Sequence, residues 1–283
     1  MVTVLAPEGA GAQYLIDALP PVPGVTVDVR SVPRSTAPFA EVYELADAAG
    51  RALGEGAEGV VVLRGTDTVE ETAWALELLH AQDVPVVLAA DPGRPSDLAE
   101  AIRVAAAGPR GLGCLLVAHG EIHAARHARR TGGIAAPAFV SPPAGPMGLV
   151  TDEAVRLLWR PLGRFTVRGQ SSGRSPRIGL HTAALGDDGE LLRIMAPHCD
   201  GLVVTPSGAR GVPEPLASVL AEPAGRIPVV LTSCTARDGA LPATSLDPLK
   251  ARVLMYLLLD AGRDREAVLE AFAAVDRGDG GQL

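Results

Sequence analysis

The sequence predicts an α/β protein with two domains, each built on a mostly parallel sheet covered by helices. Short runs of Val, Leu and Ile alternate with segments in which Ala, Leu and Glu recur at helical spacing. The strand candidates are apolar at nearly every position, which is typical of parallel sheets that are covered on both faces. The length of 283 residues also exceeds that of one ordinary domain.

The first half of the chain contains five strand candidates with helical segments between them. The strands are expected at 2–5, 25–29, 59–63, 84–89 and 112–118, and the helices at 41–53, 70–82 and 97–107. Because each strand is short and each helix is amphipathic, the pattern is that of repeated strand–helix units.

A Gly/Ser/Arg-rich stretch at 164–176 has the composition of a linker. A second alternation follows it. Its strands are expected at 178–181, 201–205 and 227–232, and its helices at 189–196, 215–221, 248–260 and 265–275. We therefore predict a larger N-terminal domain at 1–165, a linker at 166–176 and a smaller C-terminal domain at 177–283.

The composition restricts the partners of this chain. A formal net charge of −8 and a pI near 5.3 argue against nucleic acid or an anionic membrane surface as the partner. The longest apolar run, at 253–259, is too short to cross a bilayer. The sequence thus favours a soluble protein that acts on a small molecule.

The three cysteines, Cys114, Cys199 and Cys234, lie far apart and form no Cys-x-x-Cys motif. This spacing favours reduced, structural thiols in a cytoplasmic protein over a disulfide framework or a zinc knuckle. The first residues resemble a strand and have no basic segment of a secretory signal. We expect a cytoplasmic protein that needs no cofactor.

The most informative segment follows the third strand candidate and contains Gly65, Thr66, Asp67 and Thr68. A hydroxyl and a carboxylate therefore lie side by side at the carboxyl end of a strand, where open α/β sheets bind ligands. Thr68 and Glu71 have the Thr-x-x-Glu spacing of a capping box, which predicts that a helix begins here.

The segment 65–73 (GTDTVEETA) resembles the second signature of the bacterial-type L-asparaginase/glutaminase family. Similar segments follow in the family's order at 85–97 (PVVLAADPGRPSD), 117–126 (VAHGEIHAAR), 141–148 (SPPAGPMG), 200–204 (DGLVV), 211–213 (GVP) and 227–233 (IPVVLTS). The resemblance covers nearly the whole chain. It implies a two-domain asparaginase-like fold with the pocket in the larger N-terminal domain, and a homodimer or homotetramer.

The resemblance implies that the nucleophile is a threonine in an N-terminal "TGGTI" loop. A Thr-Asp-Lys set on the second signature and the "GKI" hairpin supports it, and a serine of a "DS" loop helps to hold the substrate. In this chain the nucleophile position is Ala10 and the "GKI" lysine is Glu121. Thr66 and Asp67 are retained.

Two further positions also depart from the family pattern. The "DS" serine corresponds to Arg34 or Ser35, and the asparagine of "GNVP" is Gly211. Because alanine has no nucleophile, and losing one member of a catalytic set costs orders of magnitude in rate, efficient hydrolysis of L-asparagine is not expected.

The candidate catalytic residues are Thr66, Asp67, Glu121 and Glu8. Asp67 would hold an amine, and Thr66 would donate a hydrogen bond or act as a nucleophile; alternatively, both only shape the turn. If Glu121 lies beside Asp67, one of the two carboxyls would stay protonated and act as a general acid. Otherwise Glu121 faces solvent or pairs with an arginine, Arg64 or Arg126. Glu8 is either a base or ligand, or an exposed charge in a tight turn.

The candidate substrate-binding residues are Gly65, Thr66, Asp67, Arg34, Ser35 and Ala90. A guanidinium at Arg34 would bind a carboxylate through two hydrogen bonds, unless it is only a solvated loop arginine. His119, His123 and His127 recur every four residues, which would suit a metal site on a helix. The expected hairpin and the neighbouring arginines argue against one, so no metal is expected.

Three functions remain open from the sequence. The first is an enzyme that acts on a small amino-acid-like amide or acyl compound by altered chemistry. The second is an inactive homologue that binds a small amino acid or peptide. The third is a weak residual L-asparaginase that uses Thr66.

Overall fold

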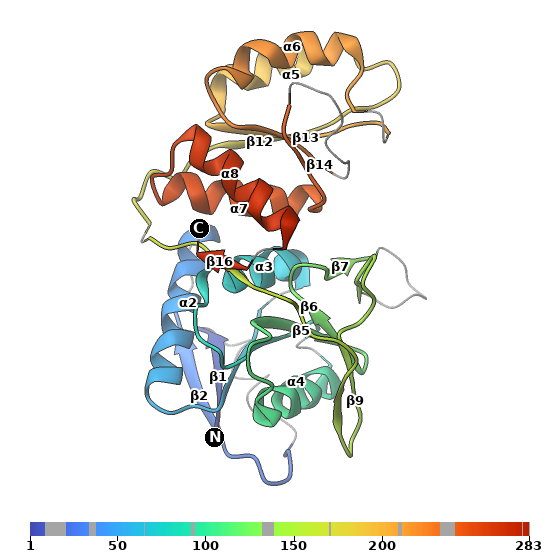
Figure 1. Ribbon diagram of the computed structural model, residues 1–283. Coiled ribbons are helices and arrows are strands. Elements are labelled where there is room, and N and C mark those ends of the chain that lie inside the picture. Colours follow the sequence, from blue (N-terminus) through green and yellow to red (C-terminus); the bar gives the residue numbers. More distant parts are fainter. Residues whose placement is uncertain are drawn as a thin grey trace. The chain divides into compact units, whose positions relative to one another are not determined.

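The computed structural model describes residues 1–8, 21–33, 38–64, 66–91, 94–131, 139–169, 171–208, 211–232, 241–278 and 280–282. The side chains of Thr66 and Gln282 are not described. The chain divides into two compact units, Met1–Pro161 and Leu162–Leu283 (Figure 1).

The first unit is built on an eight-stranded sheet. Its order is β10 (Val155–Leu157), β9 (Gly148–Val150), β6 (Glu121–Ala124), β5 (Cys114–Ala118), β4 (Val86–Ala89), β3 (Gly59–Val62), β1 (Val2–Pro7) and β2 (Val27–Val32). The five strands from β5 to β2 run parallel, and β6, β9 and β10 are added in antiparallel pairs. A separate pair is formed by β7 (Arg129–Arg130) and β8 (Phe139–Val140).

Helices cover both faces of this sheet, as the apolar strands predict. The helix α4 (Pro95–Ala107) packs against the face formed by Val61, Val87 and Leu115. The helices α2 (Pro38–Gly54) and α3 (Val69–Leu79) pack against each other; α2 contacts β1, β2 and β3, and α3 contacts β4 and β5. Gly59 is required where α4 crosses β3, because a Cβ there would lie 2.3 Å from the carbonyl oxygen of Ala105.

A tight hairpin joins β5 to β6. Ala118 pairs with Glu121, so the turn consists only of His119 and Gly120, whose φ angles are 50° and 79°. Two consecutive residues with positive φ are the mark of a type I′ turn, which matches the twist of antiparallel strands. The turn therefore lies at the carboxyl edge of the parallel strands, and β6 runs back from that edge.

The second unit contains a smaller parallel sheet in the order β12 (Ile178–Thr182), β13 (Gly201–Thr205), β14 (Val229–Thr232) and β15 (Ala243–Thr244). Its helical elements are α5 (Glu190–Met195), η2 (Ala196–His198), α6 (Glu214–Ala224), α7 (Pro248–Asp260) and α8 (Arg265–Arg277). Figure 1 shows α5 and α6 on one face of this sheet and α7 and α8 on the other. None of the described helices has the length and hydropathy needed to cross a membrane.

The structure differs from the sequence-based expectations at several boundaries. A strand, β11 (Phe165–Thr166), lies at the start of the expected linker and pairs with β16 (Gly281–Gln282) near the other end of the chain. The chain enters α3 through a 3-10 turn, η1 (Thr66–Thr68). The helix begins after Thr68, as the capping-box spacing predicts, but the predicted capping hydrogen bond is wrong. The side chain of Thr68, the N-cap residue, makes no such bond. Its φ of −126° and ψ of 25° depart from the β-region geometry that a capping hydroxyl needs.

Candidate functional site

The candidate site is the edge of the eight-stranded sheet at which β1, β3, β4 and β5 end. Parallel strands place their carboxyl ends on one edge, and ligands bind where the strand order reverses. That reversal lies at β1, because β2 flanks it on one side and β3 on the other. The described residues at this edge include Glu8 after β1, Asp67 after β3, and Glu121 after the β5–β6 turn.

Asp67 is the most open acidic group at this edge. Its side chain is fully exposed, and its Oδ1 lies 3.9 Å from Nη1 of Arg130, which is 47% exposed. The backbone N–H of Arg130 donates to Oε2 of Glu70 at 2.7 Å. Since Glu70 belongs to the first turn of α3, this bond ties β7 to the helix that follows the Thr66–Asp67 turn. The positively charged neighbour of Asp67 is therefore the guanidinium of Arg130 on β7, which is far from Asp67 in the sequence.

Arg64, which ends the segment after β3, has a different partner. Its Nη1 lies 3.0 Å from Oε2 of Glu41 on α2, and both side chains are largely buried. Glu41 is therefore the carboxylate that neutralises Arg64. The alternative in which Arg64 pairs with Glu121 does not occur.

Glu121 is the first residue of β6, and 39% of its side chain is exposed. Its Oε2 lies 3.5 Å from Nε2 of His123. No hydrogen bond or ion pair joins Glu121 to Asp67 in the described part of the chain. The carboxylate of Glu121 faces the imidazole of His123, and the carboxylate of Asp67 faces the guanidinium of Arg130.

His123 lies behind Glu121 on the same face of β6, and only 1% of it is exposed. Its Nδ1 is 2.8 Å from Oγ of Ser141, which is also buried. Burial lowers the pKa of His123 from 6.5 to about 4. The imidazole is therefore neutral at neutral pH.

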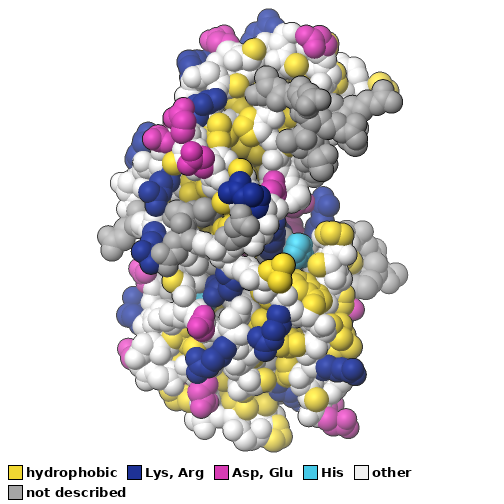
Figure 2. All heavy atoms as spheres, in the orientation of Figure 1, with side chains coloured by type: hydrophobic (Ala, Val, Ile, Leu, Met, Phe, Trp, Pro, Cys, Tyr) yellow, Lys and Arg dark blue, Asp and Glu magenta, His cyan; other side chains and the backbone are white. Residues whose placement is uncertain are grey.

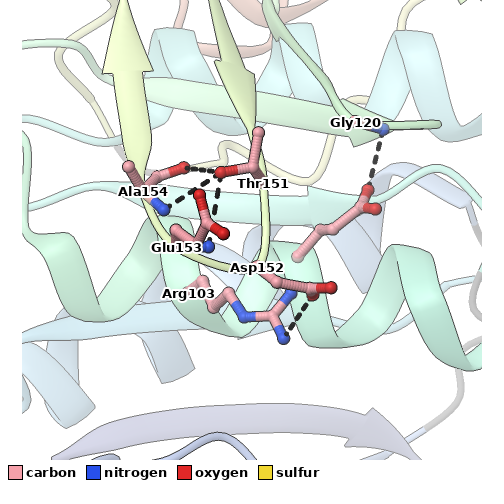
Figure 3. A network of polar contacts seen from close by, with 7 residues as sticks. Arg103, Gly120, Thr151, Asp152, Glu153 and Ala154 are labelled. Atoms are coloured by element: carbon pink, nitrogen blue, oxygen red, sulfur yellow. Dashed lines mark hydrogen bonds and ion pairs between the residues drawn. The ribbon is translucent and has the colours of Figure 1, made fainter.

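The β5–β6 turn is fixed from the other side by α4. Oε2 of Glu100 accepts from the backbone N–H of Gly120 at 2.9 Å (Figure 3). Nη1 of Arg94 donates to Nε2 of His119 at 2.7 Å. Burial raises the pKa of the Asp97 carboxyl, and Arg94 and the His119 backbone oppose that rise. Glu100 of α4 and Arg94, its N-cap residue, therefore hold this two-residue turn.

The same helix also holds the end of the neighbouring hairpin. Figure 3 shows Arg103 of α4 reaching Asp152 in the β9–β10 turn, with 3.0 Å between the guanidinium and the carboxylate. Within that turn, the backbone N–H of Ala154 donates to the hydroxyl of Thr151 at 3.1 Å. The contacts of α4 thus order two consecutive hairpins at this end of the sheet.

The remaining candidates are distributed differently. Glu8 is exposed, and its backbone N–H donates to Val32 at 3.0 Å. Ala90 is buried, and its N–H donates to the carbonyl of Val117. The methyl group and the N–H of Ala90 are therefore not available to a ligand. The positions Ala10, Arg34, Ser35 and Gly65 lie outside the described residues.

The three regularly spaced histidines do not converge. His119 contacts Arg94, His123 contacts Ser141, and His127 packs edge-on against Trp159 with 6.0 Å between ring centres. Among the described residues, no group of three His, Cys, Asp or Glu side chains is placed to hold a metal ion.

The cysteines have structural surroundings. Cys114 is buried in β5, and Cys199 is partly buried with a raised thiol pKa, chiefly because of burial. A raised pKa disfavours the reactive thiolate. Cys234 lies outside the described residues. On the face shown in Figure 2, basic and acidic side chains are interspersed rather than gathered into one basic patch.

Residues 7–163 match the family model described as the N-terminal domain of asparaginase, which is more than half of the chain. The chain belongs to the asparaginase family. A probable L-asparaginase of Deinococcus radiodurans is 31% identical over 302 aligned residues, covering 94% of this chain and 92% of that protein. A probable periplasmic L-asparaginase of Haemophilus influenzae is 29% identical over 246 residues, covering 76% of this chain and 70% of that protein.

The same fold is seen in the crystal structure of a probable cytoplasmic L-asparaginase from Campylobacter jejuni. The TM-score is 0.81 at 25% sequence identity, with 96% of this chain and 98% of that chain covered. The predicted family and the predicted two-domain α/β fold of an asparaginase are therefore confirmed.

Sequence reasoning about this asparaginase-family chain missed two residues of the edge. Arg130 was noted only as part of an arginine-rich stretch, and Ser141 only as part of a turn motif. Arg130 is 63 positions from Asp67, so only the pairing of β7 with β8 and the Glu70 bond reveal the contact. The adjacent arginines after the hairpin were the one available signal.

Proposed function

We propose that this asparaginase-family protein acts on a small amino-acid-like amide or acyl compound at the carboxyl edge of its larger sheet. It does so by altered acid/base or Thr66-assisted chemistry and is not an efficient L-asparagine hydrolase. The observation that carries the proposal is the open contact of 3.9 Å between Asp67 and Arg130.

Asp67 and Arg130 have the charges needed to bind an amino acid. A free α-amine suits the exposed carboxylate, and a carboxylate suits the guanidinium, which presents its donors as a rigid fork. The Asp67 side chain is fully exposed and its contact with Arg130, at 3.9 Å, is longer than a hydrogen bond, so the amine of a ligand can reach the carboxylate.

The charged groups at this edge do not suit the family's usual proton transfers. The resemblance implies a lysine in the set with Thr66 and Asp67, and this chain has Glu121 at that position. The guanidinium of Arg130, which faces Asp67, stays protonated in proteins, so it can bind an anion but cannot relay a proton. Together with Ala10 at the nucleophile position, this favours altered chemistry.

Glu121 is the acid–base group best placed to replace the lost function. The ends of β3 and β5 are separated by β4, so they lie roughly 10 Å apart at ordinary strand spacing. That span accommodates a small amino-acid derivative and one water molecule. Glu121 would take a proton from the water, whose oxygen bonds to the carbonyl carbon; the C–N bond then breaks, and the nitrogen leaves with that proton.

Glu8 and Thr66 are the other proposed participants. Glu8 is exposed at the end of β1, so it is open to a ligand at the same edge. Thr66 would supply a hydroxyl beside Asp67, either as a donor or as a nucleophile.

The openness of the Asp67–Arg130 contact also suits a second candidate, an inactive homologue that binds a small amino acid or peptide. Binding needs only these two charges, whereas turnover needs Glu121 or Thr66 in addition. The two candidates therefore predict the same ligands and differ only in whether those ligands are hydrolysed.

Two measurements on the purified protein test the proposal. Ammonia release from L-asparagine and L-glutamine should stay near background. Hydroxylamine release from L-aspartic acid β-hydroxamate, an activated acyl compound, should be measurable. Rapid hydrolysis of L-asparagine would contradict the proposal. A rise in Tm with the hydroxamate but without its hydrolysis would select the binding protein, and a weak L-asparagine rate abolished by Thr66→Val would select the residual asparaginase.

We also propose a cytoplasmic location and a homodimer or homotetramer, without a nucleic-acid or membrane partner. The net charge of −8 and the separated cysteines support the location and the absence of those partners. The assembly is expected from the family. Cell fractionation and light scattering test these expectations.

A further inference from the structure

A buried polar atom behind Glu121 has no hydrogen-bond partner. In the described part of the chain, Nε2 of His123 makes no hydrogen bond, although the residue is only 1% exposed. Unpaired buried polar atoms are rare and costly, and they cluster at functional positions. Oε2 of Glu121 lies 3.5 Å from this nitrogen, which is slightly too far for a hydrogen bond.

The other ring nitrogen fixes the orientation of the imidazole. Nδ1 of His123 is 2.8 Å from Oγ of Ser141, and only 3% of Ser141 is exposed. A serine hydroxyl either donates or accepts, so this contact is compatible with both tautomers of a neutral histidine. Glu121 therefore decides between them.

Only one tautomer is compatible with an ionised Glu121. If Nδ1 carries the proton, the lone pair of Nε2 faces a carboxylate oxygen at 3.5 Å, which is repulsive. If Nε2 carries the proton, Ser141 donates to Nδ1 and Nε2–H points its positive end at the carboxylate. The second arrangement gives Nδ1 a hydrogen-bond donor and places the N–H of Nε2 toward an oxygen that attracts it.

The backbone on the other side of Glu121 is equally constrained. The β5–β6 turn immediately before it is bonded to Glu100 of α4 and to Arg94, the N-cap residue of that helix. Glu121 thus follows a fixed turn and precedes a fixed imidazole, while 39% of its side chain remains exposed at the edge.

We propose that His123, held by Ser141, is a positioning residue that directs the carboxylate of Glu121 for acid–base catalysis. The inference rests on the proposed function, because it gives Glu121 the catalytic role assigned there. The 3.5 Å contact shortens when a ligand excludes water from the edge, as catalytic hydrogen bonds do.

The first test reads the tautomer directly and needs no activity. Protein labelled with ¹⁵N-histidine is examined by long-range ¹H–¹⁵N NMR at pH 7, and His123 is assigned with His123→Gln. We expect at least about a tenfold excess of the Nε2–H form and a smaller excess in Glu121→Gln, because the charge is removed. A wild-type protein in the Nδ1–H form, or a ratio unchanged by Glu121→Gln, overturns the inference.

The second test measures hydrolysis of L-aspartic acid β-hydroxamate. His123→Leu and Ser141→Ala should each lower kcat about tenfold with less than a roughly twofold change in KM. His123→Gln should keep at least about half of kcat, because an amide can accept from Ser141 and donate to Glu121. If His123→Leu does not fold, Ser141→Ala decides. Equal losses in His123→Gln and His123→Leu indicate a merely structural role and overturn the inference.

The two proposals fail in different ways. A wild-type protein that is inactive on the hydroxamate but has Nε2–H at His123 overturns the proposed enzyme, and the catalytic role with it. An active wild-type protein with Nδ1–H at His123 overturns the positioning role alone.

Discussion

The ends of β3 and β5 lie on one edge of the same sheet, but their polar groups are held in opposite ways. At the end of β3, Asp67 is fully exposed, and its ion pair among the described residues is a long one, with Arg130. Beyond the end of β5, Glu121 has the buried pair His123 and Ser141 behind it, and the preceding turn is bonded to α4. Asp67 can therefore exchange its contact with Arg130 for a contact with a ligand, whereas Glu121 is held in place by its neighbours.

This difference indicates a division of tasks. Binding a charged ligand is easiest where the resident ion pair is weak and solvated. Acid–base chemistry needs a group held in place by its own partners before the substrate arrives. We therefore assign anchoring to the β3 end and chemistry to the β5–β6 region, and four predictions test that assignment.

The largest effect is expected from supplying the two family groups that the resemblance assigns to positions 10 and 121. The double variant Ala10→Thr/Glu121→Lys should raise ammonia release from L-asparagine at least about a thousandfold, because it supplies both the nucleophile and a titratable amine. Each single change should give less than about a tenfold rise, since members of a catalytic set depend on one another. A large rise with Glu121→Lys alone would show that position 10 is not the place of the nucleophile.

The next effect concerns pH and the buried His123. Its pKa is lowered from 6.5 to about 4, so between these values the unfolded chain binds more protons than the folded chain. The contribution to stability is complete above pH 6.5 and is lost as the pH falls toward 4, by about 3 kcal/mol in total.

Urea unfolding of wild type and His123→Gln between pH 4 and 7 measures this loss. In His123→Gln, the free energy of unfolding should fall less steeply between pH 6.5 and 4 than in the wild type. His198→Gln, at an exposed position, should show the wild-type dependence on pH. A His123→Gln protein with the wild-type slope would show that another group causes the pH dependence.

A smaller effect is expected for binding at the open end. Asp67→Asn should weaken binding of L-aspartic acid β-hydroxamate by about 2 kcal/mol, because a charged hydrogen bond to the ligand amine is lost. Isothermal titration measures it. The matched control is Asp152→Asn, whose side chain is 91% exposed in the β9–β10 turn and should bind as wild type does. Equal affinities in wild type and Asp67→Asn would remove Asp67 from the binding site.

The smallest effect concerns the bond that α4 makes to the β5–β6 turn. Glu100→Ala should lower the free energy of unfolding by about 1 kcal/mol, because the N–H of Gly120 loses its acceptor. Glu100→Gln keeps an acceptor and should lose less than half of that. Glu153→Ala is the exposed control. If Glu100→Gln and Glu100→Ala are equally destabilised, the side chain acts through its charge rather than through this hydrogen bond.

Much of the fold could be predicted because its determinants are local. The runs that form β3, β4 and β5 are apolar throughout, and these strands are buried on both faces. The helix α7 begins at Pro248 and ends at Asp260, the predicted limits. Boundaries moved where a turn intervened: Val25 bonds back to Val22, so β2 begins at Val27 rather than at Val25.

The site could be predicted only in part. The position of Thr66 and Asp67 at a strand end follows from the order of apolar run, glycine and helix. The partner of Asp67 does not follow, because Arg130 lies 63 positions away in the sequence and reaches Asp67 only through the packing of the β7–β8 pair.

By itself, the sequence determined the two α/β units, the family, and the place of Thr66 and Asp67 at the end of a parallel strand. These depend on periodicity and on residue identity, which are readable along the chain. Only the tertiary structure decided that Arg130 faces Asp67 and that His123 and Ser141 stand behind Glu121. The physical reason is that side-chain partners are chosen by distance in space, and the segments that carry them are brought together by packing far from their own positions in the sequence.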